Sequence, residues 1–177
     1  MLQALVVDFG NPSSLHWAGK DARRLVDQAR LDVAERIGCR PDEVTFTSGA
    51  TEADNLALFG TLSLYPSEKA HLITSAIEHH AVLHAAHRLE RDGYAVTYLP
   101  VDGRGVVDPD DVRRAIRPHT RLISVMSVNN EVGSIQPVAE IGRIAHEHGV
   151  RFHTDAVQSI GLFDVNVDDL NADLLSL

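Results

Sequence analysis

The chain has 177 residues, 44% of them hydrophobic and 23% charged, which is ordinary for a soluble globular protein of one large domain. The formal net charge of −9, without any run of lysine or arginine, argues against a nucleic-acid-binding surface. No apolar run approaches the roughly 20 residues of a membrane span, and residues 1–8 lack the charged start and cleavage site of a signal peptide. The single cysteine, Cys39, excludes a disulfide framework and fits a cytoplasmic protein.

A long amphipathic helix is predicted near the start of the chain. Residues 1–7 have the pattern of the tail of a helix or strand, and residues 10–14 (G-N-P-S-S) that of a turn. From residue 15 to residue 37, apolar side chains recur at steps of three and four, which is typical of a helix with one buried face. Gly38 is expected to end this helix.

Residues 44–55, V-T-F-T-S-G-A-T-E-A-D-N, predict a strand, a tight turn and the start of a helix. The strand is expected to be short and buried over residues 44–47, and Thr51 is expected to be the N-cap of a helix over residues 52–60. The apolar positions of this helix are Leu56, Leu58 and Phe59. Such a turn points free backbone N–H groups at an anion, most often a phosphate, although a plain structural turn is more common.

Strands and helices then alternate to the end of the chain. Strands are predicted over residues 71–75, 95–99, 121–128 and 151–155, and helices over residues 81–91, 109–116 (capped by Asp108) and 138–148 (with Pro137 at its start). A short helical piece near Asp168 and a last apolar run over residues 173–177 follow. This rhythm of apolar strands and helices predicts an α/β fold with a mostly parallel sheet and flanking helices.

Four polar clusters follow predicted strands: Ser48–Thr51, Glu78–His80, Asn129–Glu131 and Asp155–Gln158. In parallel sheets, ligands bind beyond the carboxyl ends of the strands, so these clusters are expected at one edge. Their chemistry suits pyridoxal 5′-phosphate (PLP), because a carboxylate such as Asp155 can keep the pyridine nitrogen protonated. An imidazole such as His79 can lie over the ring, and an amide can bind the phenolic oxygen.

Five strings resemble the cysteine desulfurases that supply sulfur for iron–sulfur clusters and tRNA thiolation: G-N-P-S-S-L-H, T-F-T-S-G-A-T-E-A-D-N-L-A, S-A-I-E-H-H-A-V, V-N-N-E-V-G-S-I-Q-P and H-T-D-A-V-Q-S-I-G. The resemblance runs from Phe9 to Leu177. It implies a class V aminotransferase-like, fold type I PLP enzyme, typically a cytoplasmic homodimer. The implied reaction takes L-cysteine to L-alanine and leaves a persulfide for a sulfur-acceptor protein such as an iron–sulfur scaffold.

The resemblance also implies roles for individual residues. Ala50 and Thr51 would contact the PLP phosphate, and His79 would be the catalytic residue that stacks on the ring and shuttles a proton. Asp155 would pair with the pyridine nitrogen. Asn130 and Gln158 would bind at the phenolic oxygen.

Two features of the family have no counterpart here. Its Ser-Gly-His-Lys motif, whose lysine bonds covalently to the cofactor, would follow Leu177, and neither Lys20 nor Lys69 matches that lysine. The family's catalytic cysteine lies further on, and Cys39 does not match it. Residues 15–177 are therefore expected to be part of a PLP-binding large domain, preceded by an N-terminal remnant over residues 1–14. Such a chain is not expected to turn over cysteine efficiently by itself.

Other interpretations stay open at this point. Selenocysteine lyases and other class V enzymes share the cofactor-holding residues. A non-catalytic remnant that binds PLP or a partner, and a second polypeptide that supplies the lysine and cysteine, are further alternatives.

Several residues also have simpler explanations. His80, His84 and His87 are spaced to share a helix face and bind a metal, but an exposed polar face is the preferred explanation. His153 and Asp155 share a strand face, where His153 is expected to pack or hydrogen-bond beside the cofactor. Asn129 and Asn130 could form a turn, and Glu131 is as plausible a structural acceptor as a catalytic group.

Overall fold

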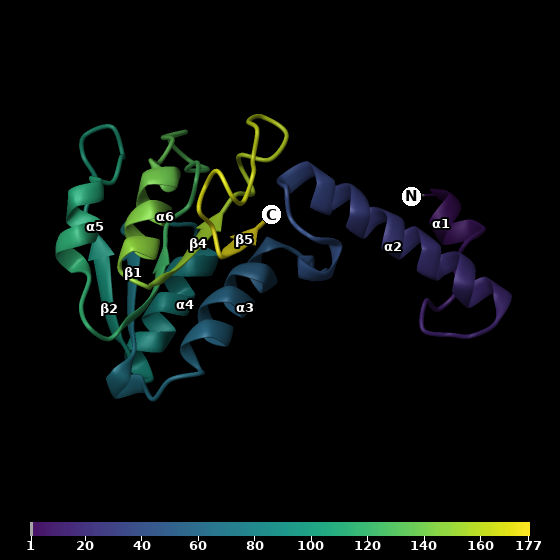
Figure 1. The fold of residues 1–177 in the computed structure, drawn as a ribbon, viewed down its shortest axis with the longest axis horizontal. Helices are drawn as coiled ribbons and strands as arrows, with labels where there is room; N and C mark the ends of the chain where they lie inside the picture. Colours follow the sequence, from purple (N-terminus) through teal and green to yellow (C-terminus); the bar gives the residue numbers. More distant parts are fainter. Residues whose placement is uncertain (1) are drawn as a thin grey trace. The chain divides into compact units, whose positions relative to one another are not determined.

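The computed structural model describes residues 2–177, which form two compact units: the first 46 residues and residues 47–177. The first unit contains the helices α1 (Leu2–Val6) and α2 (Trp17–Ile37) and the short 3₁₀ helix η1 (Pro41–Glu43) (Figure 1). His16 caps α2, because its Nδ1 accepts a hydrogen bond from the backbone N–H of Gly19 at 3.3 Å. Gly38 ends the helix with φ 74°, a left-handed conformation that favours glycine. The predicted long helix and its glycine end are thus confirmed.

The strand predicted over residues 44–47 is wrong. The structure places no strand there within residues 2–177, and Phe46 is 50% exposed. The segment is held to α2 instead: the guanidinium of Arg30 donates a hydrogen bond to the Val44 carbonyl and lies 5.0 Å from the centre of the Phe46 ring. β-branched residues favour strands only where a neighbouring strand offers pairing and packing, which this segment lacks.

The second unit is an α/β structure built on one parallel sheet, as the sequence predicts. The five strands lie in the order β2-β1-β3-β4-β5, and every neighbouring pair is parallel. The strands are β1 (His71–Ser75), β2 (Ala95–Leu99), β3 (Thr120–Ser124), β4 (Arg151–Asp155) and β5 (Leu174–Ser176). The helices are α3 (Ala50–Leu62), α4 (His80–Arg91), α5 (Pro109–Ala115) and α6 (Val138–Glu147), with the 3₁₀ helix η2 (Ser67–Lys69) before β1.

Most element bounds agree with the sequence to within two residues, and those of β1, β2 and β4 agree fully. Two segments differ. The third strand ends at Ser124 rather than at residue 128. Beyond it, the N–H groups of Val125 and Ser127 still donate to the His153 and Asp155 carbonyls, at 3.1 and 2.9 Å, but β4 itself ends at Asp155. The piece near Asp168 is a turn rather than a helix, since Asn166 Oδ1 accepts from the backbone N–H of Asp168 at 2.9 Å.

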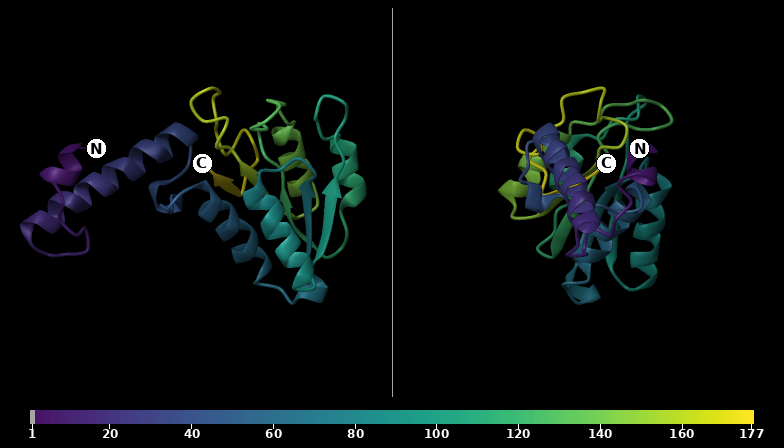
Figure 2. Two further views of the ribbon diagram at one scale, coloured as in Figure 1. Left: turned by 180° about the vertical axis from the view of Figure 1, so that it is seen from behind. Right: turned by 90° about the vertical axis from the view of Figure 1, so that its right-hand side faces the viewer.

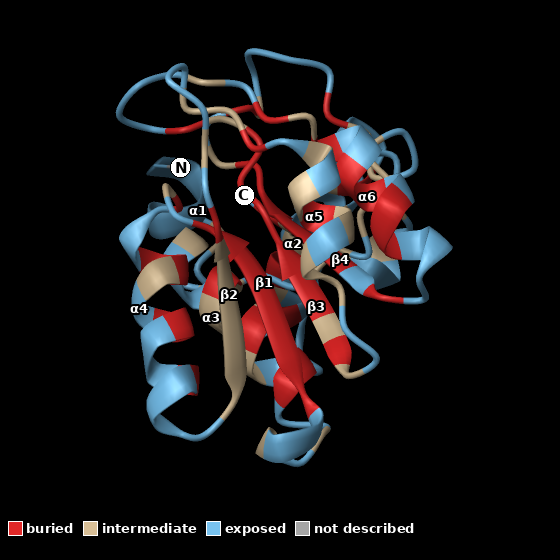
Figure 3. Cartoon of the chain, turned by 90° about the vertical axis from the view of Figure 1, so that its left-hand side faces the viewer, coloured by how far each residue is buried: buried red, intermediate tan, exposed pale blue. Residues whose placement is uncertain are grey.

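Helices cover both faces of the sheet, and each face has its own apolar core. Helices α3 and α4 lie side by side on one face (Figure 2), where they pack against Leu72 of β1 and Leu122 of β3. Helices α5 and α6 cover the other face and pack against Ile73 and Ile123, the next residues along the same strands. Strand β1 is buried along its whole length, as the red ribbon in Figure 3 shows. Burial on both faces explains why the strands are nearly continuous apolar runs.

Among residues 2–177, none of the helices combines the length and the apolarity needed to cross a bilayer.

Candidate functional site

The strand order marks one place at the sheet edge where a ligand can bind. Strand β1 pairs with both β2 and β3, so the chain leaves β1 through α4 on one face and leaves β3 towards α6 on the other. In sheets of this order a crevice opens beyond the carboxyl ends of the two central strands, where the connections diverge. The polar clusters that follow β1, β3 and β4 lie at this edge, as the sequence predicts.

The start of α3 leaves two backbone donors free for an anion. Gly49 is the N-cap, with φ 155°, so Thr51 is the second helical residue and the prediction that it caps the helix is wrong. The glycine carbonyl accepts from the N–H groups of the third and fourth helical residues, at 3.0 and 3.1 Å. Glu52 turns back to accept from the Ser48 N–H at 2.6 Å. The N–H groups of Ala50 and Thr51 have no intrahelical acceptor and lie at the positive end of the helix dipole.

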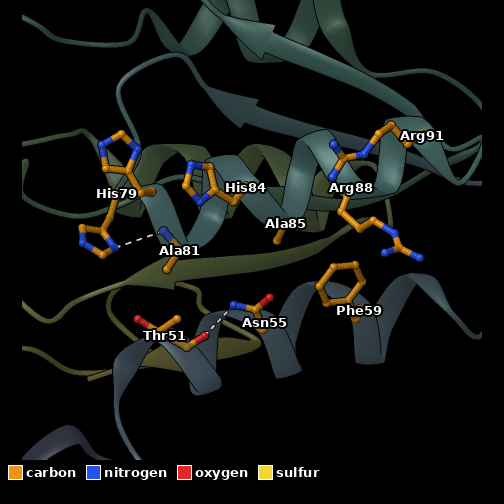
Figure 4. A pocket seen from close by; sticks show the side chains of 10 residues that line it. Thr51, Asn55, Phe59, His79, Ala81, His84, Ala85, Arg88 and Arg91 are labelled. Atoms are coloured by element: carbon orange, nitrogen blue, oxygen red, sulfur yellow. Dashed lines mark hydrogen bonds between the residues drawn. The ribbon is translucent and has the colours of Figure 1, made fainter.

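His79 is the N-cap of α4, the helix beside α3. Its Nδ1 accepts from the backbone N–H of Ala81 at 3.2 Å, which leaves Nε2 to carry the proton of a neutral ring. His79 and Thr51 line the same groove of about 550 Å³ between the two helices (Figure 4). The other lining residues are Asn55, Phe59, His80, Ala81, His84, Ala85, Arg88 and Arg91, so the groove is rich in basic side chains.

Asp155 is the last residue of β4 and is 6% exposed. Its Oδ1 accepts from the backbone N–H of Val157 at 3.0 Å, and its second oxygen is left for a ligand. Burial raises the pKa of Asp155, while the Val157 hydrogen bond and the nearby His79 act in the opposite direction. The structure therefore brings together His79 and Asp155, which are 76 positions apart in the sequence.

Glu78 is a buried acid whose role the sequence did not show. The Ser75 hydroxyl and the Met126 N–H both donate to its carboxyl group, the latter at 3.0 Å from each oxygen. Glu78 thereby joins the carboxyl ends of β1 and β3. Burial raises the pKa of Glu78 to about 8, and the charges of Asp155 and Asp54 add to the rise.

The two asparagines after β3 have different environments. Asn129 is buried and forms the turn: its Nδ2 donates to the Ile77 carbonyl at 2.7 Å, and its Oδ1 accepts from the Glu131 N–H at 2.9 Å. Asn130 and Gln158 are exposed at the same edge of the sheet. Their expected contacts with a phenolic oxygen stay predictions.

Asp54 is another buried acid, and the sequence did not indicate its burial. It is fully buried, and its neighbours on the inner face of α3 are Leu58, Thr61 and Leu62. The spacing of these four residues would have identified the buried face. Leu56, which was expected to be an apolar packing position, is 54% exposed instead.

The histidines of α4 do not gather around a metal position. The rings of His80 and His84 stack with centroids 5.2 Å apart, whereas His87 turns towards Tyr98 at 5.6 Å. Within residues 2–177 no group of three or more histidine, cysteine, aspartate or glutamate side chains is arranged to hold a metal ion.

Lys69 does not supply a covalent anchor at this edge. Lys69 ends η2 just before β1, at the amino edge of the sheet and so at the opposite edge from Asp155. Lys20 belongs to α2 in the first unit.

Comparison with known proteins gives one consistent result. The family described as "Aminotransferase class-V" matches residues 3–177. A cysteine desulfurase IscS from Methanosarcina thermophila is 51% identical over all of this chain and 44% of its own length. One from Dictyoglomus turgidum is 50% identical over 96% of this chain and 43% of its own length. A solved structure described as "SspA in complex with cysteine" superposes with a TM-score of 0.95 at 44% identity, over 98% of this chain and 50% of the other.

The chain spans about half the length of the relatives it matches. The match nevertheless covers nearly all of the present sequence, and the parallel sheet agrees with the fold type I architecture that the sequence resemblance implied. The chain therefore belongs to the class V aminotransferase family, among relatives named cysteine desulfurases.

Proposed function

We propose that this chain is the cofactor-holding part of a PLP-dependent cysteine desulfurase. Such an enzyme converts L-cysteine to L-alanine and transfers the sulfur to an enzyme persulfide for iron–sulfur cluster or thio-cofactor synthesis. The observation that carries the proposal is the placement of the α3 start, His79 and Asp155 at one edge of the sheet. The names of the relatives support the same function.

The residues present fit PLP at three points. The free N–H groups of Ala50 and Thr51 suit the phosphate, because a helix start favours an anion. The nearly buried carboxylate of Asp155 suits a protonated pyridine nitrogen, and the burial strengthens that interaction. His79 lies close enough to Asp155 to affect its pKa, which suits a ring that rests beside the imidazole.

When bound, PLP supplies an electron sink for a carbanion at the substrate α-carbon. The protein groups bind, orient and exchange protons. Asp155 would keep the pyridine nitrogen protonated, and His79 would present its Nε2–H as a hydrogen-bond donor, because its Nδ1 accepts from the Ala81 N–H. We assign Asn130 and Gln158 to the phenolic oxygen.

The proposal extends to partners and location. L-cysteine is the proposed substrate; the solved relative SspA is described in complex with cysteine. The proposed assembly is a cytoplasmic homodimer that passes sulfur to an acceptor such as an iron–sulfur scaffold protein. A non-catalytic PLP-binding role is the second candidate, favoured by the position of Lys69 at the opposite edge of the sheet. Selenocysteine lyases and other class V enzymes would use the same cofactor-holding residues.

The cofactor site is tested by titrating the 177-residue chain with PLP and with pyridoxine 5′-phosphate, which lacks the aldehyde and cannot react with lysine. We expect saturable binding of both, and a loss of about ten- to a hundredfold in Asp155→Asn, because a charge-assisted hydrogen bond contributes about 1.5–3 kcal/mol. Asp169→Asn, at an exposed position, is the matched control. Equal affinities of the wild type and Asp155→Asn would reject the assigned pyridine contact.

The reaction is tested in a chimera that joins this chain to the C-terminal half of the Methanosarcina thermophila relative. Alanine release from L-cysteine that depends on PLP and on His79 would support the desulfurase assignment. A folded chimera that binds PLP but releases no alanine would favour the non-catalytic role.

A further inference from the structure

A row of buried polar side chains crosses the sheet below the candidate site. Thr74 of β1, Ser124 of β3 and His153 of β4 are partners in register on neighbouring strands, and all three are fully buried. They lie on the face that α3 and α4 cover. Thr74 is two positions after Leu72 on β1, and Ser124 is two positions after Leu122 on β3, so each pair shares that face. Buried polar groups in a core are unfavourable unless they are hydrogen-bonded, so this row needs an explanation.

His153 is the centre of the row. Its Nδ1 lies 2.9 Å from the Ser124 hydroxyl, and its Nε2 lies 3.0 Å from the Ser176 hydroxyl. The imidazole thus joins three neighbouring strands, β3, β4 and β5. Burial lowers the pKa of His153 to about 4, so the ring is neutral at neutral pH.

Asp54 reaches this row from α3. Its Oδ1 lies 3.7 Å from His153 Nε2, beyond hydrogen-bond distance, and neither of its oxygens has a hydrogen-bond partner in good geometry within residues 2–177. The Ser176 hydroxyl is near enough to act on the carboxyl group. A fully buried, unpartnered carboxyl is costly, and an apolar side chain of similar size would be expected to give a more stable core.

The row lies between the two groups that are proposed to hold the ends of the cofactor. Asp54 is three residues after Thr51, so both lie near one side of the first turns of α3. His153 is two residues before Asp155 and shares its strand face. The carboxyl and the imidazole therefore lie where α3 meets the end of β4.

We propose that Asp54 is a positioning residue: through His153 and Ser176 it sets the start of α3 relative to Asp155, and so fixes the separation of the phosphate and pyridine contacts. This inference rests on the proposed function. PLP is a rigid ring with its phosphate and ring nitrogen on different sides, so both contacts form only if the protein holds them at the right separation. Where reacting groups must be held in place, a misplacement of about 1 Å can lower the rate on the order of a hundredfold.

The test separates the whole ligand from its parts, with the 177-residue chain and three probes: pyridoxine 5′-phosphate, pyridoxine and inorganic phosphate. Asp54→Leu keeps the branching of the side chain, with methyl groups larger than the oxygens, and removes the polar contact. Asp54→Asn keeps polar atoms at both positions. Ser176→Ala removes the hydroxyl on β5 that lies 3.0 Å from His153 Nε2, and it decides the question if Asp54→Leu does not fold. Asp169→Asn is again the exposed control.

We expect Asp54→Leu and Ser176→Ala to bind pyridoxine 5′-phosphate at least about tenfold more weakly, with affinity for inorganic phosphate within about twofold of the wild type. Asp54→Asn should retain most of the affinity for the whole ligand. Equal weakening for phosphate and for the whole ligand would indicate general damage to the fold and overturn the positioning role. Unchanged affinity for the whole ligand in both variants would overturn it as well.

The same titration distinguishes this inference from the proposed function. A wild type that binds none of the three probes would reject the cofactor site, and with it any role of Asp54 towards that site. A wild type that binds pyridoxine 5′-phosphate, together with unaffected variants, would reject the role of Asp54 alone.

Discussion

Replacing Asp54 with asparagine should change how the stability of the second unit depends on pH. Burial and the nearby Asp155 charge raise the pKa of Asp54 from 3.8 to about 7 in the folded protein. The folded state therefore binds more protons than the unfolded chain between about pH 4 and pH 7. The stabilisation from the protonated form is complete below pH 4 and is lost as the pH rises towards 7. Asparagine does not titrate, so the variant should not show this loss.

The size of the effect follows from the shift. Each pKa unit corresponds to 1.36 kcal/mol, so the two units between about pH 5 and pH 7 should change the free energy of unfolding by about 2 to 3 kcal/mol. Asp54→Asn should therefore become more stable relative to the wild type by that amount between pH 5 and pH 8. Contributions from titrating groups that do not interact with Asp54 cancel in this difference, because both proteins contain them.

Urea unfolding at pH 5, 6, 7 and 8, followed by far-ultraviolet circular dichroism, measures this difference. Asp169→Asn, at an exposed position, is the control and should leave the pH dependence of the wild type unchanged. A difference that stays flat across the pH range would refute the raised pKa. A difference of opposite sign would mean that the carboxylate is stabilised in the fold, as in an ion pair with a protonated His153.

Three further substitutions test the packing and hydrogen bonds around the site. Glu78→Ala should lower the free energy of unfolding at pH 6 by at least about 1–3 kcal/mol, because the Met126 N–H is left without its acceptor. A smaller loss in a urea titration would contradict this explanation. Gly142→Ala should lower the free energy of unfolding by about 1–3 kcal/mol, because a Cβ there would lie 2.4 Å from the Leu170 carbonyl oxygen. Gly103→Ala, with open space around the Cβ, is the control and should leave the free energy of unfolding unchanged in the same assay. Gly38→Ala should destabilise α2 by roughly 1–2 kcal/mol, because alanine is strained at the Gly38 φ of 74°. Urea unfolding followed by Trp17 fluorescence measures this loss, and an unchanged midpoint would contradict the expected strain.

The sequence predicts the ends of strands correctly where the local residue pattern and the burial of the strand agree. Strands β1 and β4 are bounded by turn residues and buried on both faces, so their apolar runs predict their ends correctly. Residues 44–47 have the same β-branched composition, but none of the five described strands pairs with them. Strand formation depends on a partner that is distant in sequence, and composition alone does not reveal whether one exists.

Part of the candidate site could be predicted from the sequence, and part of it could not. The topology of a parallel sheet brings strand ends together, which is why His79 and Asp155 could be expected near each other. The burial of Asp54 and of Glu78 was not predicted, because a carboxylate near a helix start is ordinarily solvated there. Their burial depends on how α3 and the loop after β3 pack over the sheet, which involves contacts between distant parts of the chain.

The three buried carboxyl groups also determine where negative charge can reside at this edge. Burial raises the pKa of Asp54 to about 7 and that of Glu78 to about 8, so at neutral pH Glu78 is mostly protonated and Asp54 is partly protonated. The pKa of Asp155 is also raised, but the Val157 N–H and the nearby His79 favour its ionised form. Each charge disfavours the others, so the carboxylate that faces a cationic ring nitrogen is the one that ionises most easily. A protonated Glu78 thus adds no negative charge beside Asp155, the carboxyl group that is proposed to bind the cofactor.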